Sequence, residues 1–401
     1  MPHNFDHISF LVGDSDVLER MAVQRALPPF DAQIINFLDA LTKRLLRHPL
    51  AKTFPDVISL AFWCRKSSVL QMRQTYPDLS SRRGRGIAFH IAPSNVAVNF
   101  AYSLAVGLLS GNANIVRVPS RDFMQVAIIC EALSDTLREW PAIAPYLCLI
   151  RYDRNKSIND TLSAYCQSRL IWGGDDTIGA LRQSPLGARG IDITFANRYS
   201  FALIDAANYL TMSDKRAIAE RFYNDTFLTD QNACTSPRLV VWLGEDSATT
   251  PARAAFWREF EQLSQEKYQL QEAVAIKKLG QFCVLSATKE GVKKASDSNN
   301  LVYRVQIAAL DDTTMRFTEV GGYFLEYLAH DIAEILPVCD ERCQTLSVLG
   351  VEKENIDAFL RGYRPAGIDR VVAVGKTMDF GLHWDGYDLI YILSRTVSVS
   401  L

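Results

Sequence analysis

The sequence predicts an α/β protein built from two α/β domains with a cleft between them. The first reason is length, because the chain has 401 residues, 48% of them hydrophobic, and a single hydrophobic core stops growing at roughly 250 to 300 residues. In addition, short β-rich runs alternate with longer helical runs, which is typical of parallel βαβ units. No stretch rich in Pro or Gly separates the two halves, so we expect the domains to pack against each other.

The N-terminal half shows this alternation most clearly. Strands are expected at "GIAFHIA", "NANIVRV", "LCLIRY", "RLIWGG", "IDITF" and "SFALIDA". Helices are expected at "PFDAQIINFLDALTKRLL", "AVNFAYSLAVGLLSG" and "DFMQVAIICEALSDTLREW". Gly111 follows the second of these helices and suits a left-handed C-terminal cap. We assign residues 1–205 to a first domain with a leading helical region.

The second half repeats the pattern, and we assign residues 206–375 to a second α/β domain. Its expected strands are "RLVVWLG", "LVYRVQIAAL", "QTLSVLG" and "DRVVAVG", and its expected helices include "MSDKRAIAERFYNDTFL" and "KENIDAFLRGY". Residues 376–401 form a C-terminal segment whose end, "LIYILSRTVSVSL", alternates like an edge strand. Such a strand can pair with another subunit, so we expect a homo-oligomer, in the simplest case a dimer.

Composition argues against several classes of protein. The formal net charge is only -2, which argues against binding to nucleic acid or to an anionic membrane. The longest apolar stretch, "NVAVNFAYSLAVGLL", is shorter than the roughly 20 residues that a membrane span needs. The N-terminus has no basic region followed by an apolar core, so we expect no secretory signal and a cytoplasmic protein. The pair Cys339 and Cys343 lacks further ligands, and we expect no metal site.

The stretch "DQNACTSP" raises the question whether Cys234 is a buried filler or a nucleophile. A thiol attacks as its thiolate, which requires nearby donors or a cation and access for the substrate. The neighbours Ala233, Thr235 and Ser236 are small and leave room for a substrate carbonyl. Local chemistry alone leaves both interpretations open.

Two further stretches place polar groups after expected strands. In "HIAPSNVAVNF", Asn95 follows a strand, where open α/β sheets bind ligands; its amide can stabilise an oxyanion, or it can cap the following helix. In "NIVRVPS", Arg117 and Ser120 suit the ribose and phosphate of a nucleotide, although a solvated Arg is the alternative.

A glycine pair suggests a place for an anion. In "WGGDDTI", Gly173 and Gly174 allow close approach to the backbone, and the following helix can offer its N-terminus to an anion. Neither the GxGxxG fingerprint nor a P-loop motif occurs in the chain.

Taken together and in order, these stretches resemble the aldehyde dehydrogenase superfamily and, within it, the acyl-CoA reductases of the bacterial luminescence fatty acid reductase type. The resemblance covers roughly residues 55 to 395 and includes the closing "DRVVAVGKTMDFGLHWDGYDLI". It implies an aldehyde dehydrogenase-like fold, with a cofactor domain followed by a catalytic domain. It also implies NADPH-dependent reduction of a fatty acyl thioester, such as an acyl-CoA, to an aldehyde.

The resemblance also implies roles for particular residues. Cys234 matches the nucleophile, and Asn95 matches the residue that stabilises the oxyanion together with the backbone N–H of Cys234. Glu319, in "FTEVGG", resembles the Glu that contacts the nicotinamide ribose. The remaining cofactor-binding positions are Arg117, Ser120, Gly173, Gly174 and Thr177.

One departure from the superfamily favours the reductive direction. Oxidising aldehyde dehydrogenases keep a Glu base upstream of the nucleophile, but the corresponding stretch, "DITFANRYSFALIDA", contains no Glu. Without that base, acyl exchange with a thiol is favoured over hydrolysis. Asp192 and Asp205 lie in this stretch and are expected to have structural duties. The alternatives are an NAD-linked aldehyde dehydrogenase working oxidatively and a noncatalytic protein that binds an acyl-transferring partner enzyme.

Overall fold

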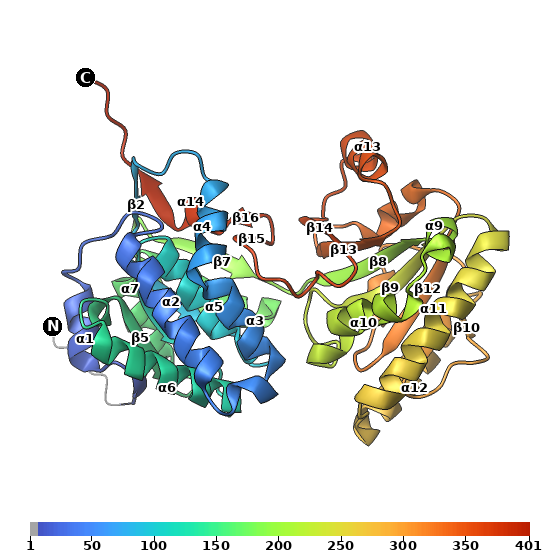
Figure 1. Cartoon of the computed structure of the whole chain (residues 1–401), viewed down its shortest axis with the longest axis horizontal. Helices are drawn as coiled ribbons and strands as arrows, with labels where there is room; N and C mark the ends of the chain where they lie inside the picture. Colours follow the sequence, from blue (N-terminus) through green and yellow to red (C-terminus); the bar gives the residue numbers. More distant parts are fainter. Residues whose placement is uncertain (1–6) are drawn as a thin grey trace. The chain divides into compact units, whose positions relative to one another are not determined.

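The computed structural model describes residues 7–401, which form two compact units (Figure 1). The first unit comprises residues up to 196 together with 380–401, and the second comprises residues 197–379. Residues 1–6 lie outside the described residues. The expectation that the N-terminus carries no secretory signal falls partly on these residues. Within residues 7–401, none of the helices combines the length and the apolar character needed to span a bilayer.

The first unit contains a six-stranded sheet with the order β1-β5-β4-β3-β6-β7. β1 is antiparallel to β5, and every other neighbouring pair is parallel. The strands are β1 (Ser9–Val12), β3 (Ile87–Ile91), β4 (Ala113–Arg117), β5 (Leu147–Arg151), β6 (Ser168–Trp172) and β7 (Ile191–Phe195). The chain runs from β3 outward to β5 and then crosses to β6 on the other side of β3. The strand order therefore reverses between β3 and β6, which is where open α/β sheets bind ligands.

Helices pack on both faces of this sheet, because each face carries its own hydrophobic core. The larger core takes residues from α2, α3, α5 and α6, and the smaller takes residues from α1, α7 and α8. The helices are α1 (Ser15–Met21), α2 (Ala32–Arg47), α3 (Pro55–Cys64), α4 (Lys66–Gln74), α5 (Asn99–Leu109), α6 (Met124–Glu139), α7 (Lys156–Tyr165) and α8 (Asp175–Arg182). Gly111 follows α5 with a φ of +85°, which confirms the expected left-handed cap.

The second unit contains a seven-stranded sheet with the order β10-β11-β12-β9-β8-β13-β14. β10 is antiparallel to β11, and the other pairs are parallel. The strands are β8 (Tyr199–Asp205), β9 (Pro237–Leu243), β10 (Lys293–Lys294), β11 (Tyr303–Gln306), β12 (Tyr323–Ala329), β13 (Cys343–Leu349) and β14 (Arg370–Ala373). The helices are α9 (Ala206–Thr211), α10 (Lys215–Thr226), α11 (Asp246–Lys267), α12 (Glu272–Thr288) and α13 (Lys353–Tyr363).

The boundary between the units differs from the expected one after residue 205. Strand β8 belongs to the second unit, where it lies between β9 and β13 and pairs in parallel with both. A strand buried on both faces has the same apolar composition whichever sheet it joins. Its sequence therefore could not show that the boundary precedes it.

The C-terminal segment also differs from expectation, because it returns to the first unit. Residues Leu389–Ile392 form the helical turn α14, and the side chain of Asp388 accepts a hydrogen bond from the Tyr391 N–H at its start. Earlier in the segment, β15 (His383–Trp384) pairs antiparallel with β16 (Tyr387–Asp388). After α14, β17 (Ser394–Thr396) pairs antiparallel with β2 (Arg82–Gly84). The alternation that predicted one long edge strand thus reflects a helical turn, in which Leu389 and Ile390 are buried and Tyr391 is exposed, followed by a short strand.

Candidate active site

Cys234 lies in a tight turn at the entrance to β9 in the second unit, and its side chain is half-buried. Asp230 and Gln231 both adopt left-handed backbone conformations, with φ of 50° and 60°. Two backbone hydrogen bonds close the turn, from the Asn232 N–H to the Thr229 carbonyl at 2.8 Å and from the Ser236 N–H to the Ala233 carbonyl at 3.1 Å. The thiol is therefore held on a defined backbone.

Gln231 connects this turn to the segment that leads into β12. Its amide Nε2 donates to the carbonyls of Pro237 at 2.8 Å and Tyr323 at 3.2 Å. Its Oε1 accepts from the N–H groups of Gly322 at 2.9 Å and Tyr323 at 3.2 Å. The side chain is fully buried, and these four bonds satisfy it. Sequence reasoning missed Gln231, whose only signal is its place three residues before the Cys.

Two side chains from neighbouring strands contact Cys234 directly. The hydroxyl of Ser200, on β8, donates to the Cys234 carbonyl at 2.7 Å. The amide Nε2 of Gln344, on β13, donates to the Cys234 sulfur at 3.3 Å. Both residues are buried. The sulfur thus has a positioned hydrogen-bond donor, which is the kind of contact that a nucleophilic thiol needs.

The guanidinium of Arg238 interacts electrostatically with two of the predicted residues, Cys234 and Glu319. Burial lowers the pKa of the Arg238 guanidinium, while Cys234 and Glu319 act in the opposite direction. Its Nη2 donates to the Gln231 carbonyl at 3.4 Å, and its buried Nε has no hydrogen-bond partner among the described residues. The half-buried Glu319 accepts from the Val320 N–H at 2.9 Å. One cation therefore neighbours both groups.

The turn that carries Glu319 is fixed by two glycines and a buried lysine. Gly321 and Gly322 have φ of +69° and +87°, and a Cβ on Gly322 would lie 2.3 Å from the Leu301 carbonyl oxygen. Lys278, on α12, donates to the carbonyls of Gly321 at 2.6 Å and Asn300 at 2.5 Å. Burial lowers the pKa of Lys278 to about 8, and nearby Glu319 opposes that change. The glycine pair of "FTEVGG" is thus a structural requirement.

In the first unit, Asn95 is exposed between β3 and α5. The N-cap of α5 is Val98, and no side chain caps that helix. Asn95 lies three residues before Val98, so the alternative of a cap for this helix stays a prediction. Its role at an oxyanion stays a prediction.

Arg117 is the last residue of β4, and Tyr152 holds it in place. Its Nη2 donates to the Tyr152 carbonyl at 3.1 Å, and its guanidinium lies over the Tyr152 ring at 4.6 Å from the centroid. Arg117 is therefore only partly exposed, and its role at a nucleotide stays a prediction. Ser120 is exposed in the loop before α6.

Gly173 and Gly174 follow β6, and Gly174 is the N-cap of α8 without a side-chain cap bond. Asp175 and Asp176 occupy the first turn of that helix, so an anion at this end would share it with two carboxylates. A Cβ on Gly173 would lie 3.2 Å from Cγ2 of Thr177, whose side chain is exposed.

Topology brings the predicted oxyanion residue and two predicted cofactor residues to one edge of the first sheet. Asn95, Arg117 and Gly173 lie at or after the ends of β3, β4 and β6, which are neighbours in the sheet. Because the three strands are parallel, their carboxyl ends meet at the same edge, beside the reversal of strand order.

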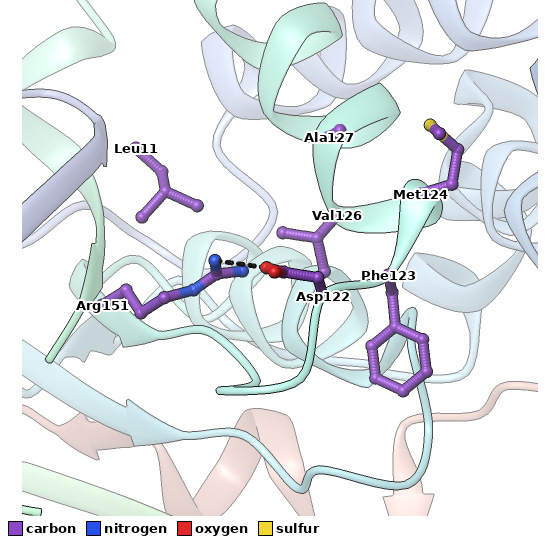
Figure 2. A pocket seen from close by; sticks show the side chains of 7 residues that line it. All are labelled: Leu11, Asp122, Phe123, Met124, Val126, Ala127 and Arg151. Atoms are coloured by element: carbon purple, nitrogen blue, oxygen red, sulfur yellow. Dashed lines mark hydrogen bonds and ion pairs between the residues drawn. The ribbon is translucent and has the colours of Figure 1, made fainter. Parts of the chain in front are cut away.

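A cavity of about 390 Å³ lies between β1, the end of β5 and the start of α6 in the first unit (Figure 2). Asp122 and Arg151 form an ion pair at 2.7 Å in its wall. The other lining residues are Leu11, Phe123, Met124, Val126 and Ala127. None of the predicted cofactor residues lines this cavity, so it adds no support to their assignment.

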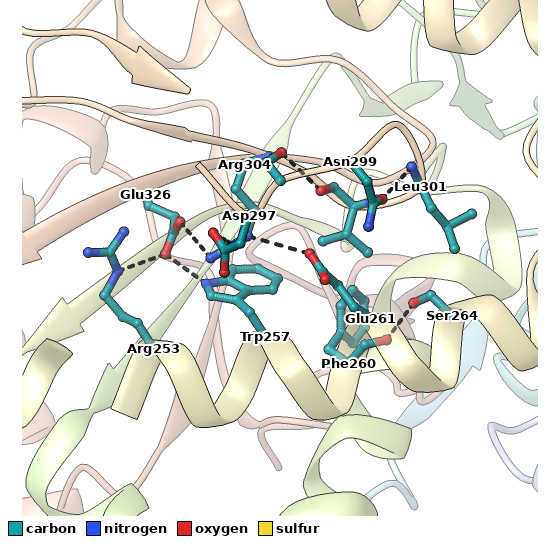
Figure 3. A network of polar contacts seen from close by, with 12 residues as sticks. Arg253, Trp257, Phe260, Glu261, Ser264, Asp297, Asn299, Leu301, Arg304 and Glu326 are labelled. Carbon is teal, nitrogen blue, oxygen red and sulfur yellow. Dashed lines mark hydrogen bonds and ion pairs between the residues drawn. The ribbon is translucent and has the colours of Figure 1, made fainter. Parts of the chain in front are cut away.

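The second unit also buries a carboxylate that sequence reasoning did not single out (Figure 3). Glu326, on β12, is fully buried and accepts hydrogen bonds from the indole N–H groups of Trp242 at 3.0 Å and Trp257 at 2.7 Å. Arg253 binds the same oxygen at 3.0 Å, and Arg304 lies 3.7 Å from the other. The charge is compensated inside the core, as a buried carboxylate requires, and we assign this network a structural role.

The two Asp residues expected to have structural duties do have them. Asp192 accepts from Arg169 through both carboxylate oxygens, at 2.7 and 2.9 Å. Asp205 caps α9 by accepting from the Asn208 N–H at 2.8 Å. Among residues 7–401, no group of three or more His, Cys, Asp or Glu side chains is arranged to hold a metal ion.

Comparison with known proteins gives one family and one fold. The family described as acyl-CoA reductase (LuxC) matches residues 16–397. No curated protein matches the sequence.

Solved structures share the fold at low sequence identity. An NAD-dependent benzaldehyde dehydrogenase from Corynebacterium glutamicum superposes with a TM-score of 0.62 at 13% identity, over 98% of this chain and 95% of that one. An NADP-dependent enzyme from E. coli superposes with a TM-score of 0.58 at 12% sequence identity, over 91% of this chain and 78% of that one. An oxidoreductase from Marinobacter aquaeolei superposes with a TM-score of 0.62 at 12% sequence identity, over 91% of this chain and 83% of that one. The expected aldehyde dehydrogenase-like fold is thereby confirmed.

Proposed function

Since the chain belongs to the acyl-CoA reductase (LuxC) family, we propose that it reduces a fatty acyl thioester to the aldehyde with NADPH, through an acyl-enzyme on Cys234. The observation that carries this proposal is the hydrogen bond from Gln344 to the Cys234 sulfur at 3.3 Å. A filler thiol has no need of a buried donor. A nucleophile does, because the reactive form is the anion.

In the proposed reaction, the Cys234 thiolate attacks the carbonyl carbon of the acyl thioester. The carbonyl becomes a tetrahedral oxyanion, for which Asn95 and the Cys234 N–H are the proposed donors. The oxyanion then collapses, the bond to the leaving sulfur breaks, and the departing thiolate takes a proton from solvent. The acyl group remains on Cys234 as a thioester.

The residues at the carboxyl edge of the first sheet suit a nicotinamide dinucleotide. Gly173 and Gly174 let a phosphate approach the backbone, and Arg117 offers a cation whose buried Nε has no hydrogen-bond partner among the described residues. Glu319 is the proposed contact to the nicotinamide ribose. When bound, NADPH supplies the hydride that reduces the acyl group. Two solved relatives of the fold, an NADP-dependent enzyme and an anhydro-galactose dehydrogenase in complex with NADP, support this choice of cofactor.

The reductive direction is supported by what lies beside the sulfur. The amide of Gln344 donates to the sulfur and cannot act as a base toward water. The stretch from Asp192 to Ala206 supplies no Glu. An oxidising aldehyde dehydrogenase needs a base that activates water, because water releases the acyl group as an acid. These residues offer no such base.

The test compares two assays on the same preparation. We expect loss of NADPH absorbance with long-chain acyl-CoA, with the aldehyde trapped by a hydrazine. We expect little reduction of NAD by aldehydes. The reverse pattern would establish the oxidative alternative, and failure of NADPH to bind in a fluorescence titration would establish the noncatalytic one.

A further inference from the structure

Two irregularities of the second sheet lie opposite the same short segment of β8. In the pairing of β13 with β8, Cys343 faces Tyr199 and Thr345 faces Ser200. Gln344 is therefore an extra residue without a partner on β8. In the pairing of β9 with β8, Pro237 faces Ser200 and Leu239 faces Phe201, so Arg238 is an extra residue in the same way.

Such bulges are uncommon between parallel strands, and they occur next to active sites, where they change the direction of a side chain. Here both bulges serve the same thiol. Gln344 contacts the Cys234 sulfur at 3.3 Å, and Arg238 interacts electrostatically with Cys234. Ser200, the β8 residue between the bulges, binds the Cys234 carbonyl at 2.7 Å. The three contacts arise at one end of three adjacent strands.

We propose that the paired bulges present Gln344 and Arg238 as a device that keeps Cys234 in the thiolate form. Gln344 gives a neutral hydrogen bond to the sulfur. Arg238 gives a positive charge that acts on both Cys234 and Glu319. The thiol proton goes to solvent, so no general base is required beside the sulfur. The inference rests on the proposed role of Cys234 as the nucleophile.

The buried position of Gln344 supports this function over a purely structural one. Its side chain is 2% exposed, and a donor buried against a neutral thiol would make a weak bond. Against a thiolate the same donor makes a charge-assisted bond, which is roughly twice as strong. An amide is also the group that stabilises the anion without offering a base to water.

The experiment measures the rate at which iodoacetamide alkylates Cys234 as a function of pH, by mass spectrometry of the Cys234 peptide. Cys283 is exposed, so every protein carries Cys283→Ser to remove that competing thiol. The variants are Gln344→Met, which keeps the approximate length without the donor, and Arg238→Met. Gln265→Met, at an exposed glutamine of α11, is the matched control.

We expect Gln344→Met to slow alkylation at pH 7 about tenfold and to move the midpoint of the profile upward by about one pH unit, as loss of a hydrogen bond to a charged group predicts. Arg238→Met should move the midpoint in the same direction, and Arg238→Lys should restore most of the wild-type profile. Gln265→Met should leave it unchanged. If Gln344→Met folds and its profile coincides with that of the wild type, the inference is wrong.

If Gln344→Met does not fold, the alkylation profiles of Arg238→Met and Arg238→Lys test the inference instead, because both variants keep Gln344. Coincidence of the Arg238→Met profile with that of the wild type would then contradict the inference. Alkylation requires neither acyl-CoA nor NADPH, so it tests the thiolate apart from the reaction. A shifted profile with no acylation of the wild type would contradict the proposed function alone. Normal acylation with an unshifted profile would contradict this inference alone.

Discussion

The side chain of Gln231 should determine the local stability of the active-site turn. Gln231→Leu puts an apolar side chain of similar size in the buried position and removes both the donor and the acceptor. The N–H groups of Gly322 and Tyr323 then lose the Gln231 oxygen that accepts from them at 2.9 and 3.2 Å. The carbonyls of Pro237 and Tyr323 lose the donor at 2.8 and 3.2 Å.

The expected magnitude follows from those lost bonds. A buried polar group left without a partner costs about 1 to 3 kcal/mol. Counting only the two N–H groups, the variant should lose about 2 to 6 kcal/mol of local stability. At 1.4 kcal/mol for each factor of ten, the lower value corresponds to about 30-fold faster opening.

Hydrogen exchange followed by mass spectrometry measures this directly. Peptides that cover β9 and the start of β12 should exchange at least about 30-fold faster in Gln231→Leu, while peptides from β3 to β6 serve as an internal control and should be unchanged. Gln231→Glu keeps an acceptor but replaces the donor, and it should also be destabilised because its oxygen faces two carbonyls. If the Leu variant exchanges at the wild-type rate in β9, the account of this turn is wrong.

Three further predictions concern the first unit. Burial lowers the pKa of His90 to about 4. Between pH 6.5 and 4 the unfolded chain therefore binds a proton at His90 that the folded chain does not bind, and the contribution of His90 to stability should fall by about 3 kcal/mol across that window and no further below it. Urea unfolding at stepped pH measures the fall, and an equal slope in His90→Gln would contradict the assignment. If Arg117 binds a 2'-phosphate, Arg117→Ala should weaken NADPH binding about tenfold and spare NADH; fluorescence titration with both cofactors checks this, and an equal loss for both would refute it. Val397, Val399 and Leu401 are exposed apolar residues after β17, so light scattering should give twice the mass of the chain, and a monomer would contradict the expected dimer.

The sequence predicted most of the secondary structure because buried strands and amphipathic helices have distinct periods. The strands at "GIAFHIA" and "RLVVWLG" and the cap at Gly111 are examples, and the structure has each of them. Placing β8 required knowledge of which sheet it joins, and its apolar sequence carries no such information.

Within the candidate site, Cys234 and Glu319 were predicted from the family resemblance, and the structure gives them a common neighbour in Arg238. Gln231, Gln344 and Arg238 were not predicted. The last two approach the thiol because of bulges, and a bulge depends on the register between strands that are distant in sequence. No local pattern encodes that register.

The central claim is that Cys234 carries the acyl group, and single-turnover labelling tests it most directly. The protein is mixed with radiolabelled acyl-CoA, and the label is located by peptide mapping before and after NADPH is added. We predict a hydroxylamine-sensitive label on the Cys234 peptide that leaves as aldehyde when NADPH is added, and no label in Cys234→Ala. Label on another residue, or Cys234→Ala that is acylated and turns over, would contradict the account.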